Sequence, residues 1–167
     1  DADTSPVAVD APSLPVDPEE IADDLLRMIF VCCAEIVPEE SQVGIALKTL
    51  CGFSVAEIAL RLFTSEASVY KRLGRARDRL REIAPEIEAP PLEALKSRLP
   101  NVQAVLYLLF NEGYLSVHAE DAIRCELCDE AVRLTTLLAE HPIGAVPETF
   151  ALLALMHLHA SRLGARR

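Results

Sequence analysis

Residues 53–82 read FSVAEIALRLFTSEASVYKRLGRARDRLRE, and this stretch decides the fold of the first half of the chain. Ser54 followed by Glu57 three positions later is a capping box, in which each side chain bonds the backbone N–H of the other residue. A helix is therefore predicted to start at Ser54. Its inner face is formed by apolar residues that recur at helical spacing, Ile58, Ala59 and Leu62.

A second short helix follows after a turn at Phe63 and Thr64. Ser65 is a suitable N-cap, because its hydroxyl can accept a bond from a backbone N–H of the first turn. Two short capped helices joined by a three-residue turn predict a helix-turn-helix. The apolar residues of the second helix that point inward are Val69, Leu73, Ala76 and Leu80.

The second helix has a basic outer face. Residues 61–81 hold seven bases and two acids, whereas residues 1–40 hold 11 acids and one base. The net charge of −10 argues against the whole chain acting as a stand-alone nucleic-acid binder, because DNA phosphates would repel it. One interpretation is a DNA-reading surface near the front of the helix; the other is a helical hairpin whose bases only solvate one face. With about 100° per residue, the residues that share the outward arc are Ser68, Lys71, Arg72 and Arg75.

Several motifs carry a resemblance to a known family. The run Phe53 to Ala59, then Ser65, Val69, Arg72-Leu73 and Arg75 to Arg77, resembles the fourth conserved region of bacterial sigma factors, specifically the extracytoplasmic-function (ECF) group. Further segments are similar to the subgroup with a long helical C-terminal extension, so that the resemblance covers roughly residues 20–167. These segments are 24–33 (DLLRMIFVCC), 106–114 (LYLLFNEGY) and 152–159.

The resemblance implies a promoter-specificity subunit of RNA polymerase. Promoter DNA would be the ligand, read at the minus thirty-five element, and core RNA polymerase the partner, bound through its flap segment. No cofactor or metal is implied, and the family's first DNA-binding domain is absent from the sequence. Phe63 stands where many relatives have Gly, and Ala34 where subgroup members often have His. The predicted DNA-binding residues are Arg61, Ser65, Ser68, Lys71, Arg72 and Arg75.

The chain as a whole is predicted to be all-α, because it has no Trp, 5% aromatic residues and abundant Ala and Leu. Two patches hold seven of its 11 prolines and divide it. The first residue is Asp, so the sequence is expected to be a piece of a longer chain. The predicted organisation is a flexible leader (1–16), the helix-turn-helix domain (17–83), a hinge (84–90) and an incomplete helical extension (91–167). The helices expected outside residues 53–82 are one starting at Asp17-Pro18, one from Pro38 to Cys51-Gly52, Pro91–Leu99, Asn101–Phe110, about Ala119–Glu140 and Pro147–Arg162.

Other function classes find little support. The five Cys lie in apolar, helix-period segments, as expected of free thiols in a reducing cytoplasm. The longest uncharged run has 13 residues, short of the about 20 that span a bilayer, so a soluble, cytoplasmic protein without membrane contact is predicted. Cys125 and Cys128 have metal-ligand spacing, but no second pair exists. Because no phosphate loop or nucleophile elbow occurs, an enzyme is not expected.

Two features of the sequence each allow two interpretations. The phrase from Asn111 to Tyr114 is interpreted as a helix C-terminus with Gly113 as its left-handed cap, or as an intramolecular contact between the extension and the DNA-binding domain. The whole chain could also be a protein-interaction module whose helix-turn-helix is only structural. DNA reading would be favoured if Ser68, Lys71 and Arg75 were exposed together and not covered by the C-terminal helices.

Overall fold

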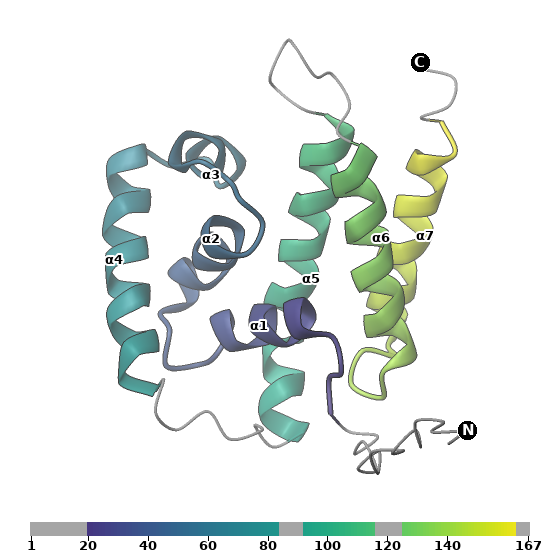
Figure 1. The fold of residues 1–167 in the computed structure, drawn as a ribbon, viewed down its shortest axis with the longest axis horizontal. Helices are drawn as coiled ribbons and strands as arrows, with labels where there is room; N and C mark the ends of the chain where they lie inside the picture. Colours follow the sequence, from purple (N-terminus) through teal and green to yellow (C-terminus); the bar gives the residue numbers. More distant parts are fainter. Residues whose placement is uncertain (1–19, 84–91, 116–124, 163–167) are drawn as a thin grey trace, which may run out of the picture.

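A computed structural model describes residues 20–83, 92–115 and 125–162 of the chain. Within these residues the fold consists of seven α-helices and no strand, which confirms the predicted all-α class (Figure 1). No helix in the described ranges is both long and apolar enough to cross a membrane. The helices are α1 (Asp24–Cys32), α2 (Glu39–Thr49), α3 (Val55–Arg61), α4 (Glu66–Ile83), α5 (Leu92–Tyr114), α6 (Cys125–Glu140) and α7 (Pro147–Ala160).

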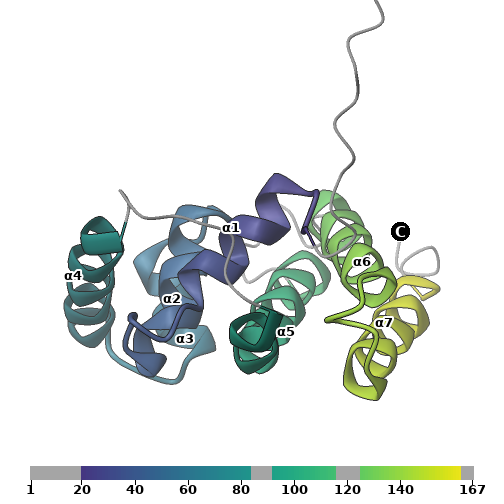
Figure 2. The same ribbon diagram turned by 90° about the horizontal axis from the view of Figure 1, so that it is seen from below.

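The helices form two groups on either side of α5. Helix α4 lies at one edge of the molecule, with α2 and α3 packed against it, and α7 lies at the opposite edge beside α6 (Figures 1 and 2). Helix α5 runs between the groups and packs on α1 and α2 on one side and on α6 and α7 on the other. The C-terminal helices are therefore separated from α4 by the body of the protein.

The local signals of the helix-turn-helix are realised as predicted. Glu57 N–H donates to Ser54 Oγ at 3.1 Å and Ser54 N–H donates to a carboxylate oxygen of Glu57 at 2.6 Å, which completes the capping box of α3. Ser65 caps α4, because its Oγ accepts a bond from Ser68 N–H at 3.2 Å. Gly52 has φ +74°, the left-handed conformation expected after the end of α2.

The first helix starts later than predicted. Residues 20–23 are not helical, and α1 begins at Asp24 with Asp23 as its N-cap, whose carboxylate accepts from Leu26 N–H at 2.9 Å. Asp17 and Pro18, where the helix was expected to start, lie outside the described residues. The prediction failed because Asp23 offers an equally good cap several residues downstream.

Helix α5 corrects two further predictions. It was expected as two helices broken at Pro100, with Gly113 in a left-handed cap, yet it runs unbroken from Leu92 to Tyr114, and Gly113 is a buried helical residue. Pro100 lies on the exposed side, where water can satisfy the carbonyl that loses its helical bond. Packing of α5 against four other helices offsets the roughly 3 kcal/mol that an internal proline costs.

One hydrophobic core runs through the described residues. Buried side chains of the helix-turn-helix group, such as Phe30 and Ile58, belong to the same cluster as Leu106 and Leu134 of the C-terminal helices. The predicted hinge (84–90) and the predicted leader (1–16) lie outside the described residues, so the domain boundaries stay a prediction. Limited proteolysis between about residues 83 and 92 tests the hinge.

The C-terminal helices are joined by a tight turn. Helices α6 and α7 begin at Cys125 and Pro147, and residues 119–124, expected as part of α6, lie outside the described residues. Between them the chain passes so close to the end of α6 that a Cβ on Gly144 would lie 2.0 Å from the carbonyl oxygen of Leu138. The turn between α6 and α7 therefore admits only glycine at this position.

Candidate nucleic-acid interface

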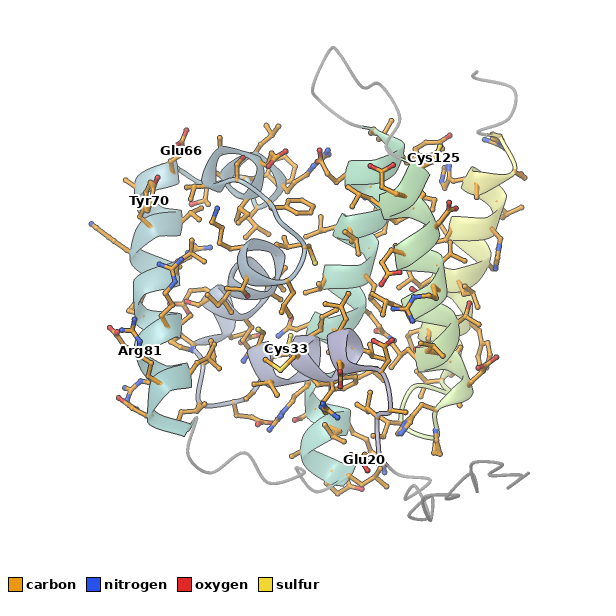
Figure 3. All side chains as sticks on the ribbon, in the orientation of Figure 1. Glu20, Cys33, Glu66, Tyr70, Arg81 and Cys125 are labelled. Carbon is orange, nitrogen blue, oxygen red and sulfur yellow. The ribbon has the colours of Figure 1, made fainter. Side chains whose placement is uncertain are left out.

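Helix α4 is held by one face and presents the other to solvent. Val69, Leu73 and Ala76 are each at most 2% exposed and pack toward α2 and α3, as the sequence predicted. Glu66, Tyr70 and Arg81 lie along the outer edge of α4, at the side of the molecule farthest from α7 (Figure 3). The apolar stripe thus fixes α4 on the domain, and the rest of the helix is available to a ligand.

The residues predicted to read DNA lie together on this free part of α4. Lys71 and Arg75 are exposed, Ser68 and Arg72 are half-buried, and Ser65 is the exposed cap of the helix. The C-terminal helices α6 and α7 lie across the molecule from them (Figure 1). Lys71 and Arg75 are therefore exposed and left uncovered by the extension, as expected for DNA reading, whereas Ser68, the third residue of that expectation, is only half-exposed.

Two of these arginines contact an acidic residue that the sequence analysis did not single out. Arg75 pairs with the carboxylate of Glu40 at 3.1 Å, and Arg72 donates to the backbone carbonyl of Glu40 at 3.4 Å. Glu40 lies in the first turn of α2, 35 positions before Arg75. No local pattern marks such a pair, because it exists only once α2 and α4 are packed.

Arg61, the sixth residue of the predicted set, faces the extension. Its guanidinium donates to a carboxylate oxygen of Glu112 at 2.8 Å and to the carbonyl of Leu115 at 3.2 Å. The side chain of Glu112 is 1% exposed and that of Arg61 17% exposed, so this pair is largely removed from water. A signal existed in the sequence, since Glu112 is an acid within a run that has no other Asp, Glu, Lys or Arg between Arg98 and Glu120, but its partner could not be deduced.

The turn between α3 and α4 is strained. Phe63 has φ +50°, in the left-handed region where a side chain other than glycine is uncommon, and it is 96% exposed. It stands at the position where the family resemblance leads us to expect Gly. The turn keeps its geometry through a bond from Thr64 N–H to the carbonyl of Ala59 at 2.9 Å.

Polar contacts also connect the remaining helices across the core. Arg98 of α5 pairs with Glu35 at 3.1 Å, and Arg133 of α6 pairs with Asp23 at 2.7 Å. Asn101 donates to Gln42 at 2.7 Å, and Gln42 in turn donates to the carbonyls of the loop after α1. These contacts fix α5 and α6 against the start of the helix-turn-helix domain.

All five cysteines are free thiols, and four of them have low reactivity. Burial raises the pKa of Cys33 and Cys51 to about 12 and that of Cys32 and Cys128 to about 11, so these four are protonated at neutral pH. In the described part of the chain no three His, Cys, Asp or Glu side chains come together as metal ligands.

A capped helix-turn-helix with an exposed basic face defines a module of the DNA-binding helix-turn-helix class. Residues 27–80 match the family model of sigma-70 region 4, and the protein therefore carries a sigma-70 region 4 domain. Residues 98–167 match a family of unknown function, DUF6596. The two matches correspond to the two helical groups that meet at α5.

A curated relative extends over both groups. The chain is 37% identical over 151 residues to a protein of Rhizobium meliloti (strain 1021) that is described as uncharacterized. The match includes 90% of this chain but only 36% of the relative, so the chain spans little more than a third of the relative's length. No solved structure matches the chain.

Proposed function

We propose that this chain is part of an ECF sigma factor that recognises the minus thirty-five promoter element through α4 and binds core RNA polymerase. The observation that carries the proposal is the joint exposure of Lys71 and Arg75 on the outer face of α4, within a sigma-70 region 4 domain. Basic side chains on the second helix of a helix-turn-helix contact base edges and phosphates in the major groove. The protein would act in the cytoplasm, without a catalytic step of its own.

The C-terminal helices would regulate this activity by setting the position of the DNA-reading domain. Support comes from the Arg61–Glu112 pair and from the packing of α5 on α1 and α2. Because α4 is left free by α5 to α7, the extension in this arrangement would hold the domain ready for DNA rather than block it (Figure 2).

Charge reversal on α4 tests the DNA-reading part of the proposal. Lys71→Glu or Arg75→Glu removes a contact and adds a repelling charge, and each should weaken promoter binding by about 1 to 3 kcal/mol for a lost base contact. The matched control is Arg77→Glu, which makes the same change on another side of α4, about 200° around the helix from Arg75 at about 100° per residue.

The measurement is promoter binding by the whole sigma factor with core polymerase at several salt concentrations, because the net charge of −10 weakens binding by the isolated chain. Far-UV circular dichroism should show unchanged helicity for all three variants. If Lys71→Glu and Arg75→Glu bind like Arg77→Glu, α4 does not read DNA, and the helix-turn-helix is a scaffold for protein interaction. A pull-down with core RNA polymerase tests the second partner directly.

A further inference from the structure

On the basic face of α4, Arg75 forms an ion pair with an acidic residue of the same chain, Glu40. Glu40 reaches across from the first turn of α2, and its carboxylate lies 3.1 Å from Nη1 of Arg75. Its backbone carbonyl accepts from Arg72, so both arginines lean toward the same residue. A carboxylate at this distance offers a guanidinium the same kind of oxygen acceptor that a DNA phosphate offers.

The ion pair is accessible to solvent, so another anion can take the place of Glu40 beside Arg75. The two side chains are about half exposed, 56% for Arg75 and 45% for Glu40, and an exposed ion pair is weak because water screens it. A phosphate that approaches Arg75 meets the negative charge of Glu40 at the same time. Binding any DNA duplex through Arg75 thus requires that the Glu40 contact be given up, with a carboxylate left close to the phosphate.

We propose that Glu40 is an affinity-limiting residue, which competes with DNA phosphate for Arg75 and thereby weakens binding to DNA of any sequence. This inference rests on the proposed promoter-reading function of α4. The loss of the internal pair lowers the affinity for every sequence, so only DNA that adds base contacts to the phosphate contacts is bound tightly. Both affinities are then lower with Glu40 than without it, whereas their ratio is unchanged.

The test replaces the carboxylate by its uncharged isostere. Glu40→Gln should raise the affinity of the 167-residue chain for a duplex of scrambled sequence about two- to fivefold at low salt, the range that an exposed ion pair permits. The slope of log affinity against log salt concentration should become steeper by about the amount that one phosphate contact contributes. Affinity for the promoter duplex should rise by a similar factor, and the melting temperature should stay within the narrow range of a surface substitution.

Glu39 provides a matched control. It is the exposed neighbour of Glu40 in the same helical turn, and no ion pair or hydrogen bond of its carboxylate is found among the described residues. Glu39→Gln makes the same change in net charge without touching Arg75. In addition, Glu40→Gln should lose its effect in an Arg75→Gln background, because the competition acts through that side chain.

The outcomes separate the two claims. Equal behaviour of Glu40→Gln and Glu39→Gln, or persistence of the Glu40→Gln effect without Arg75, overturns the competition while the promoter-reading function stands. A wild-type chain that binds promoter and scrambled duplexes equally, and that is indifferent to Arg75→Gln, overturns the proposed function and this inference with it.

Discussion

Removal of the Arg61 guanidinium should destabilise the fold more than removal of its partner's charge. Arg61→Met keeps the apolar stem of the side chain but leaves the carboxylate of Glu112, which is 1% exposed, without its cation. An uncompensated buried charge costs about 3 to 5 kcal/mol when a buried pair is broken. Because 17% of the Arg61 side chain is exposed and water can reach the site, we expect a loss of about 2 to 4 kcal/mol.

Glu112→Gln leaves a guanidinium that still bonds the Leu115 carbonyl and reaches water, so it should cost only about 1 to 2 kcal/mol. The double variant should be less destabilised than the sum of the two single variants by about 1 kcal/mol or more. Urea unfolding followed by far-UV circular dichroism measures all three. Equal losses for the single variants, or strict additivity, would refute the view that a buried ion pair joins α3 to α5.

The same variants decide what Arg61 does. It was predicted from the sequence to contact DNA, whereas in the structure its guanidinium is bound to α5. If Arg61→Met lowers promoter binding with no loss of stability, the DNA role is correct and the pair with Glu112 is incidental. Loss of stability with unchanged affinity of the folded fraction assigns Arg61 to the interface between the two helical groups.

Three further predictions concern single sites. Phe63→Gly should stabilise the protein by about 1 kcal/mol in thermal unfolding, since glycine adopts φ +50° without strain, and a loss of stability would show that the exposed ring makes a contact of its own. Leu73→Ala should cost about 2 to 5 kcal/mol by urea unfolding, because the side chain is 2% exposed, and a smaller loss would mean that α4 is loosely packed. Burial alone would raise the pKa of Asp23, but the Leu26 N–H and Arg133 hold it below the ordinary 3.8. The stability that Asp23 contributes is therefore present above about pH 4 and lost as the pH falls through the lowered pKa. In urea unfolding, wild type and Asp23→Asn should differ at pH 7, and the difference should shrink as the pH falls through that lowered pKa.

The helix-turn-helix could be predicted because its signals are local. The capping box at Ser54, the cap at Ser65 and the spacing of Val69 and Leu73 each act within one or two helical turns. Hydrophobic periodicity then identified the buried face of α4 correctly. The exposure of the basic face followed from the same periodicity, since the polar residues lie opposite the stripe.

The partners of the basic residues could not be predicted, because they depend on contacts between distant segments. Glu40 and Arg75 meet only when α2 lies beside α4, and Arg61 and Glu112 are 51 positions apart. Pro100 misled the prediction for a related reason. A proline breaks an isolated helix, but the packing of α5 on both sides supplies free energy that no local pattern contains.

The position of α5 has a consequence for how the protein is made. The segment that matches sigma-70 region 4 ends at residue 80, yet the side of α1 and α2 opposite α4 is closed by a helix that begins at residue 92. On a ribosome, which adds residues from the N-terminus, the helix-turn-helix emerges with this apolar side open until α5 has been synthesised. A chain cut at the boundary of the family match would keep that side open permanently and should associate with itself. We therefore expect the smallest autonomous folding unit to be larger than the matched segment 27–80 and to include α5, the helix that also begins the extension.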